Sequence, residues 1–250
     1  AYLDDHASYE KTGRVVDPST HKIEQLVRAL GDPHLDYRVI HVTGTNGKGS
    51  TSQIITRLLM AHGLRVGTYS SPHLEHVCER IQIDSVPLGE DEFAEAVAAV
   101  ANAEGLAGVR PSYFEIVTAA AFRAFSDAAV DVAVVEVGML GRWDATNVVQ
   151  PDVSVITNIA LDHTEFAGPT LQHIAREKAG IIKESAVAVI GETNEELLSI
   201  FAAEPNAGLV VRGEEFDVVD NHLALGGRNL HVRTSRAEYV DLFVPLHGAH

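Results

Sequence analysis

The chain has 250 residues, 46% of them hydrophobic and 22% charged, a composition that excludes a disordered, collagen-like or coiled-coil protein. Its 19 basic and 35 acidic residues give a net charge of −16, which repels phosphate backbones and anionic lipids, so we expect neither a nucleic-acid partner nor a membrane. The single cysteine excludes an internal disulfide and a cysteine zinc site, and it favours a reducing cytoplasm.

Apolar, β-branched runs alternate with helical patterns along most of the chain. We expect strands at 38–43, 64–70, 131–137, 152–159 and 186–190. We expect helices at 50–62, 90–104, 112–128, 170–183 and 195–203. Because strands and helices alternate, right-handed crossovers predict an α/β fold with a mostly parallel sheet and helices on both faces.

The last part of the chain has a different pattern. Short apolar runs in residues 209–246, beginning with LVVRG, are separated by turn residues at Asp220-Asn221 and Gly226-Gly227. This pattern predicts a small antiparallel meander attached to the sheet. We expect 1–250 to form one domain, with its β-rich subregion at 207–246. The chain stops at PLHGAH without a finishing element, which we interpret as a cut end.

The strongest local signal is the segment HVTGTNGKGS at 41–50, between a predicted buried strand and a predicted helix. Its glycines let the backbone approach an anion, the start of the helix offers free N–H groups, and Lys48 can reach terminal phosphates. Gly49 separates Lys48 from Ser50, so the strict P-loop spacing fails. A plain glycine-rich turn is the alternative. The predicted nucleotide-binding residues are Thr43, Gly44, Thr45, Asn46, Gly47, Lys48, Gly49, Ser50 and Thr51.

This loop resembles the ATP loop of the Mur ligase superfamily, and in particular its folate branch, the folylpolyglutamate and dihydrofolate synthases. Further segments resemble that branch in order and spacing. They are Tyr69–Leu74 with Glu79–Ile81, Glu136–Asn147, Asp162–Glu165, Arg176–Ile182 and Pro245–His250. The resemblance covers nearly the whole chain and implies the P-loop-like central domain of a Mur ligase.

A carboxylate, Glu136, and an imidazole, His163, each lie at or just beyond the end of a predicted apolar strand. Glu136 ends the strand at 131–137, where a carboxylate faces the ligand crevice of an α/β sheet and suits Mg²⁺; a capping or salt-bridged glutamate is the alternative. By resemblance, Ser71 shares that Mg²⁺ ion and His163 binds a second one. An ordinary loop histidine is the alternative for His163. His73 and His76 are three residues apart, a spacing that suggests a zinc site as an alternative, but no third ligand lies nearby in the sequence.

Lys178 lies on the predicted helix at 170–183, where a solvated lysine is the ordinary interpretation. The resemblance implies instead that Lys178 carries a carbamate, which turns a cation into an anion. We take Lys48, Glu136, His163 and Lys178 as the catalytic set that the resemblance implies.

The resemblance also implies a set of substrate-binding residues. Leu140 stands where the family shows the first of two adjacent glycines, and an ordinary amphipathic helix explains Phe114 as well as a substrate pocket does. The candidates are Pro72, His73, Arg80, Phe114, Glu115, Arg142 and Asp144.

The implied reaction is ATP-dependent ligation of L-glutamate to the γ-carboxylate of folate through an acyl phosphate, with dihydropteroate as a second implied acceptor. Family members carry a further C-terminal domain, so we expect this chain to need it in cis or in trans and to ligate little alone. The alternatives are a Mur-type ligase for another acid, a nucleotide-binding module without chemistry and a P-loop kinase. The segments at 71–74 and 79–81 and YEKTGR at 9–14 favour the folate branch.

Overall fold

The computed structural model describes residues 2–8, 19–162 and 164–246. An eight-stranded sheet with the order β4-β3-β2-β5-β1-β6-β7-β8 forms the centre. The strands are β1 Arg38–Thr43, β2 Val66–Tyr69, β3 Ile81–Ile83, β4 Val86–Pro87, β5 Val132–Glu136, β6 Val153–Ile156, β7 Val187–Ile190 and β8 Gly208–Val211. Strands β2, β5, β1, β6, β7 and β8 pair in parallel, and β3 and β4 are antiparallel at one edge. The predicted α/β fold with a mostly parallel sheet is confirmed.

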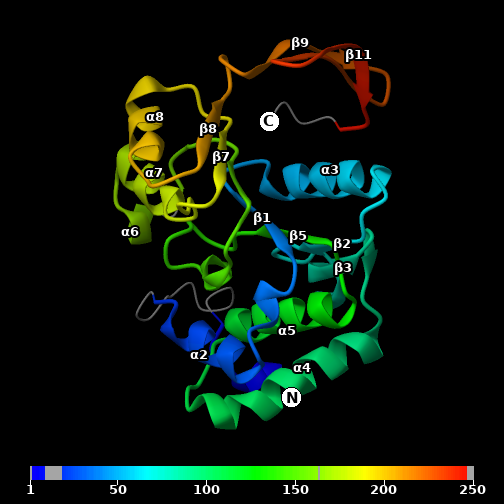
Figure 1. Cartoon of the computed structure of the whole chain (residues 1–250), viewed down its shortest axis with the longest axis vertical. Coiled ribbons are helices and arrows are strands. Elements are labelled where there is room, and N and C mark those ends of the chain that lie inside the picture. The colour runs from blue at the N-terminus through cyan, green and yellow to red at the C-terminus, as the bar shows by residue number, and fades with distance from the viewer. Residues whose placement is uncertain (1, 9–18, 163, 247–250) are drawn as a thin grey trace.

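Helices cover both faces of this sheet (Figure 1). Alternate residues of β5 separate the two layers: Val132 and Val134 join the core under α3, whereas Ala133 and Val135 join the core under α5. A third core lies where α7 and α8 pack on β6 and β7. The longer helices are α2 His21–Ala29, α3 Lys48–Ala61, α4 Glu90–Ala107, α5 Tyr113–Asp127, α7 Leu171–Ala179 and α8 Glu195–Ala202, with one further turn, α6 Thr164–Ala167.

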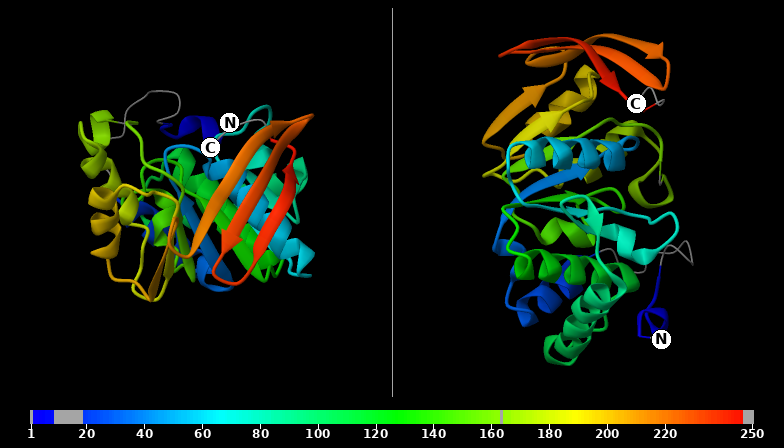
Figure 2. Two further views of the ribbon diagram at one scale, coloured as in Figure 1. Left: turned by 90° about the horizontal axis from the view of Figure 1, so that it is seen from above. Right: turned by 90° about the vertical axis from the view of Figure 1, so that its right-hand side faces the viewer.

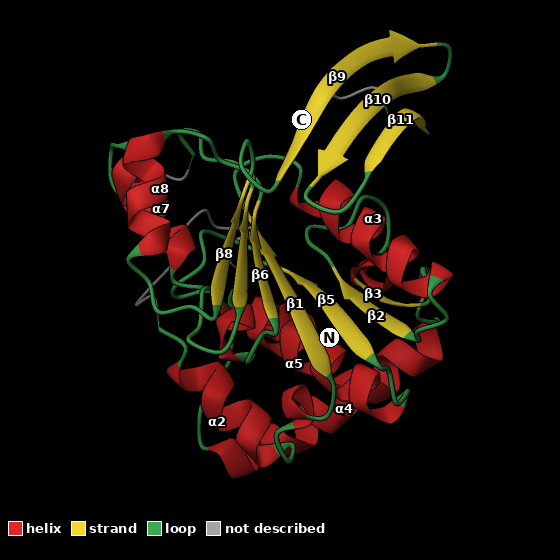
Figure 3. Ribbon diagram, turned by 45° about the horizontal axis from the view of Figure 1, so that its top comes forward, coloured by secondary structure: helices red, strands yellow, loops and turns green. Residues whose placement is uncertain are grey.

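The meander is a separate three-stranded antiparallel sheet with the order β11-β10-β9, an arm beyond the large sheet (Figures 2 and 3). Its strands are β9 Phe216–Ala224, β10 Gly227–Thr234 and β11 Glu238–Val244. The expected turn at Asp220-Asn221 is wrong, because both residues lie inside β9, next to an irregularity in its pairing with β10. The turn expected at Gly226-Gly227 is confirmed for Gly226, whereas Gly227 already begins β10.

Other differences concern where elements begin and end. The run LVV was predicted in the meander, but it forms β8, which pairs in parallel with β7 after the crossover through α8. The helix predicted at 170–183 ends at Ala179. Helix α2 and the antiparallel edge strands β3 and β4 were not predicted. In the part of the chain that the structure describes, no helix is long and apolar enough to span a bilayer.

Candidate functional site

The phosphate loop connects β1 to α3 at the carboxyl edge of the sheet. Gly44 has φ +151°, and a Cβ on it would overlap the Thr157 hydroxyl. Gly47 has φ +77° and stands as the N-cap of α3, which begins at Lys48. Only glycine fits the first position without a clash. The first turn of α3, which begins in this loop, leaves N–H groups without an acceptor inside the helix, which is the arrangement of an anion site.

A second segment, the residues after β6, fixes the loop from outside. The Thr157 hydroxyl and the Asn158 amide donate to the Asn46 carbonyl over 2.7 and 3.1 Å, and the Asn46 N–H donates to Asn158 Oδ1 over 3.0 Å. Thr45 donates its hydroxyl proton to Ala160 O. Sequence reasoning missed this support, although polar residues after a strand beside β1 were a signal that could have found it.

The remaining loop residues differ in their burial and in what they contact. Thr43 is buried and its hydroxyl donates to Leu140 O over 2.6 Å, so this side chain joins two loops. Ser50 is exposed and Thr51 is half-buried in the first turns of α3. Gly49 lies against Glu136, since a Cβ on it would be 3.5 Å from Oε2.

Two lysines converge on the Gly44 carbonyl. Lys48 Nζ donates to it over 3.2 Å, and Lys178 Nζ donates to it over 2.9 Å from α7. Lys178 is only 2% exposed, so the solvated-lysine interpretation is wrong. Burial and then the charge of Lys48 lower the pKa of Lys178 to about 8, against the opposing effect of Asp162 and Asp144. Ile174, four residues earlier, is buried on the same face of α7, and this spacing was a readable signal.

Glu136 is the buried carboxylate of the site. It ends β5 beside Val42 of β1 and accepts the Ser71 N–H over 3.4 Å. Burial raises its pKa to about 7, the Lys48 charge and the Ser71 N–H oppose that shift, and Asp144 adds to it. Among the described residues Glu136 has no ion-pair partner within 4.0 Å and caps no helix, so neither alternative to a ligand-facing carboxylate is supported.

The chemistry of this corner fits Mg²⁺. A buried carboxylate without an ion-pair partner, which accepts the backbone N–H of a serine, presents the hard oxygen donors that Mg²⁺ prefers. In the described ranges no three histidine, cysteine or acidic side chains gather as a metal cage, which gives the zinc alternative at His73 and His76 no support. His163, predicted to bind a second ion, lies outside the described residues.

The segment after β2 contains the next group of predicted residues. Pro72 is exposed and His73 is half-buried. Arg80 is fully buried, donates Nε to His73 Nδ1 over 2.9 Å and lies 5.5 Å over the Tyr113 ring. The Arg80 side chain therefore does not point into solvent, and it fixes the orientation of the His73 ring.

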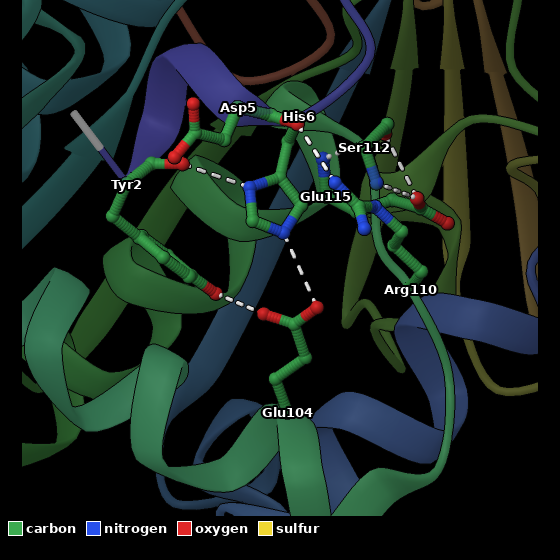
Figure 4. A network of polar contacts seen from close by, with 7 residues as sticks. All are labelled: Tyr2, Asp5, His6, Glu104, Arg110, Ser112 and Glu115. Atoms are coloured by element: carbon green, nitrogen blue, oxygen red, sulfur yellow. Dashed lines mark hydrogen bonds and ion pairs between the residues drawn. The ribbon is translucent and has the colours of Figure 1, made fainter.

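Phe114 and Glu115 lie at the start of α5. Phe114 is 5% exposed in the core and packs on Gly138 and Tyr69. Glu115 accepts the Ser112 N–H and hydroxyl over 2.6 and 2.8 Å, which is a capping box. Figure 4 shows Glu115 turned back onto Ser112 in this way.

The same figure shows how the N-terminal residues attach to these helices. The Tyr2 hydroxyl donates to Glu104 over 2.6 Å, and His6 Nε2 lies 3.2 Å from the other oxygen of Glu104 (Figure 4). Arg110 donates to Asp5 O over 3.0 Å. About a hundred residues separate these partners along the chain, so no local sequence pattern predicts the contact.

Arg142 and Asp144 are engaged within the protein. Asp144 is buried and accepts the N–H groups of Met139 and Thr146 over 2.8 and 2.9 Å; burial raises its pKa. Arg142 forms an ion pair with Glu204 and donates to Arg176 O. Leu140, in place of the family's glycine, has φ +59° in the left-handed region. These contacts shape the loop after β5.

Comparisons with known proteins agree with this geometry. A profile of the Mur ligase middle domain matches residues 42–250. The dihydrofolate synthase/folylpolyglutamate synthase of Mycobacterium tuberculosis is 40% identical in an alignment 255 residues long. The alignment covers 94% of this chain and 52% of that protein. The folylpolyglutamate synthase of Lacticaseibacillus casei is 38% identical, covering 99% and 59%. The chain thus spans between half and three-fifths of these two relatives.

Solved structures give the same picture. The structure of Mycobacterium tuberculosis folylpolyglutamate synthase complexed with ADP superposes with a TM-score of 0.90 at 38% identity, covering 100% of this chain and 57% of that one. An FPGS–AMPPCP–folate complex superposes with a TM-score of 0.91 at 36% identity, covering 99% and 61%.

Proposed function

The chain belongs to the Mur ligase family, and on that premise we propose that it is the ATP-binding part of a ligase that joins L-glutamate to the γ-carboxylate of a folate. The observation that carries the proposal is the convergence of the phosphate loop, Lys48, Lys178 and Glu136 at one edge of the sheet. Relatives named as folylpolyglutamate synthases, solved with ADP and with AMPPCP and folate, support it.

ATP would bind through its phosphates. The N–H groups at the start of α3 and the backbone of 44–47 face the anion, Lys48 reaches the terminal phosphates, and Ser50 or Thr51 bonds a phosphate oxygen. Lys48 now donates to two loop carbonyls, Gly44 O and Thr45 O, and it would exchange them for phosphate oxygens. Charge on the transferred phosphoryl group is then neutralised by groups already in place.

Glu136 and Ser71 would hold one Mg²⁺ ion, and we propose His163 for a second. When bound, Mg²⁺ neutralises phosphate charge and fixes the phosphates for in-line attack. The chain's own contribution is a buried carboxylate, Glu136, which is oriented by the Ser71 N–H.

Lys178 is proposed to carry a carbamate. Its neutral amine would attack CO₂, form an N–C bond and release one proton. The low pKa of about 8 leaves more neutral amine at neutral pH than an ordinary lysine has. The product is an anion beside the phosphate loop, able to orient Lys48 or support the metal.

The proposed reaction has two displacements. The folate γ-carboxylate attacks the γ-phosphorus, ADP leaves, and an acyl phosphate forms. The glutamate amine then attacks the acyl carbon, loses a proton, and inorganic phosphate leaves. No described side chain acts as a nucleophile, so rate acceleration comes from positioning and charge stabilisation.

The folate would approach along the segment Ser71–His73. Pro72 and His73 stay proposed contact residues, with Arg80 holding His73 in position. Four further candidates are proposed to act by shaping the walls of the folate site: Phe114, Glu115, Arg142 and Asp144. Because the matched relatives are longer, we propose that glutamate binding also uses a further domain, in cis or in trans. We also propose that the protein works in the cytoplasm, which its single cysteine favours.

A ligation assay with a panel of acceptors tests the proposal. The chain, alone and mixed with the C-terminal part of the Lacticaseibacillus casei relative, is given Mg·ATP, radiolabelled glutamate, and tetrahydrofolate, dihydropteroate or a cell-wall precursor acid. Glutamylated tetrahydrofolate in the mixture supports the proposal. Product with the cell-wall precursor alone would assign the chain to another branch, and ATP binding without any product in the mixture would favour a nucleotide-binding module.

A further inference from the structure

A second cavity lies at the opposite edge of the large sheet. It has a volume of about 530 Å³ and opens between α2, the loop after β5 and the turn after α7. We call it the α2 cavity and define it by Glu24, Arg28, His34, Trp143, Asn147 and Lys183. None of its lining residues belongs to the phosphate loop.

The position of the α2 cavity follows from the chain. His34 precedes β1, Gln150 precedes β6 and Lys183 precedes β7, so these lining residues lie at the amino edge of parallel strands. The phosphate loop follows β1 at the carboxyl edge. The six residues of β1 run roughly 20 Å between the two edges. On the α7 side the sites are closer, because Gly180 of the cavity wall is two residues from Lys178, which bonds Gly44 O.

The charge of the α2 cavity differs from that of the protein. In a chain with a net charge of −16, three basic side chains line this cavity against two acidic ones, Glu24 and Asp32. Arg142 is paired with Glu204, and Glu24 accepts the Thr20 hydroxyl. Arg28 and Lys183 form no ion pair with any residue that the structure describes.

Burial and then Arg142 lower the pKa of Lys183, with Glu204 opposing. A bound anion would favour the protonated form of this amine.

Two of the residues that line the cavity also carry a buried polar atom without a hydrogen-bond partner among the described residues. Four buried side-chain nitrogen or oxygen atoms have no hydrogen bond among the described residues, and two of them, His34 Nδ1 and Asn147 Oδ1, belong to residues of this cavity. The Asn147 amide nitrogen donates to Arg142 O and Gly180 O, which fixes the side chain. Both atoms are themselves closed off from solvent, so they lie behind the cavity surface, and the contacts to a ligand are left to Arg28, Lys183 and Trp143.

Trp143 supplies an aromatic surface to the same cavity. Its side chain is 50% exposed, and it is the single tryptophan of the chain. Half-exposed tryptophan rings bind planar groups by stacking and by burying apolar area.

We propose that the α2 cavity binds a small organic anion with a planar ring, its anionic group at Arg28 and Lys183 and its ring on Trp143. This binding does not depend on the proposed ligase function. The ligand is defined by chemistry alone: a phosphate or carboxylate joined to an aromatic ring.

Because Trp143 is the single tryptophan, its fluorescence reports on the cavity directly. Phenyl phosphate is titrated into the chain, with inorganic phosphate as the ring-free probe. We expect a saturable change with phenyl phosphate that is about tenfold weaker with inorganic phosphate, and about tenfold weaker in Arg28→Gln and in Lys183→Gln. Arg57→Gln, another exposed helical arginine outside the cavity, is the matched control and should bind as the wild type does.

Several outcomes would overturn the proposal. One is the absence of a saturable fluorescence change with phenyl phosphate. Another is a weakening of binding in Arg57→Gln equal to that in the cavity variants. A third is equal affinity for inorganic phosphate, which would show that the ring makes no contact with the site. Displacement by AMPPCP together with loss of binding in Lys48→Ala would place the probe in the phosphate loop instead. Circular dichroism of each variant confirms folding before its titration is interpreted.

Discussion

The loop after β1 and the loop after β5 leave neighbouring parallel strands at the same edge of the sheet, yet their polar groups make different contacts. The phosphate loop is held from outside, by Thr157 and Asn158, and keeps the start of α3 directed at a ligand. In the loop after β5, the polar side chains fix the loop itself. Asp144 accepts backbone N–H groups of the same loop, and Arg142 ties the loop to Glu204.

In a motif rich in polar residues, therefore, some side chains face a ligand and others only maintain the shape of the loop. From the segment after β5, the Glu136 carboxylate at its beginning lies against Gly49 of the phosphate loop, and the Leu140 carbonyl accepts the Thr43 hydroxyl. Asp144 and Arg142 keep the loop in shape. Variants in the first loop should therefore change ligand binding, and variants in the second should change stability.

Gly44→Ala should have the largest effect. The new Cβ would overlap Thr157 and push apart the two segments that form the phosphate loop, so we expect AMPPCP binding to weaken at least about a hundredfold. Gly105→Ala is the control, because a Cβ there meets nothing within 4 Å in the interior of α4, and it should raise the unfolding free energy by about 1 kcal/mol. Calorimetry and urea denaturation measure both; unchanged AMPPCP binding in Gly44→Ala would contradict the description of the loop.

Asp144→Ala should lower stability rather than affinity. It leaves buried N–H groups and the Thr146 hydroxyl without an acceptor, which costs about 4 kcal/mol. Asp144→Asn keeps one acceptor oxygen and should lose about half as much. Urea denaturation gives these values. An Asp144→Asn protein that is fully folded but has lost AMPPCP binding would show that this side chain serves the ligand.

Glu136→Gln should change how stability depends on pH. The folded pKa of about 7 lies above the ordinary 4.5, so the folded state holds an extra proton, and its stabilising effect is lost as pH rises from 4.5 to 7. Without Mg²⁺, the variant should be more stable than the wild type above pH 7, by up to about 3 kcal/mol, and should lack this slope. Parallel pH profiles of the two proteins would contradict the pKa assignment.

Lys178 offers the smallest and most local effect. With ¹³C-bicarbonate, the wild type should show one carbamate carbon resonance, because a buried amine with a pKa of about 8 is partly neutral at neutral pH. Lys178→Met should lose the resonance and Lys183→Met should keep it, although burial also lowers the pKa of Lys183. A resonance that survives in Lys178→Met would assign the carbamate to another amine.

The sequence allowed the central strands and the phosphate loop to be predicted because both are local. Apolar runs identify buried strands, and glycines beside Lys48 identify an anion loop. Strand β8 was misassigned because the run LVV fits a meander as well as a crossover, and only its register with β7 decides. The spacing of Ile174 and Lys178 signals only a shared helix face, and the polar residues after β6 signal only a loop. Their partners, Gly44 O and Asn46 O, lie more than a hundred residues away along the chain, so the contacts themselves could not be predicted.

The most direct test of the central claim is Mg·AMPPCP binding by calorimetry to the wild type, Lys48→Ala and the exposed-lysine control Lys22→Ala. We expect saturable binding to the wild type and to Lys22→Ala, and binding weakened at least about tenfold in Lys48→Ala. Equal affinity in all three proteins would contradict it, because the nucleotide would then bind away from the loop between β1 and α3.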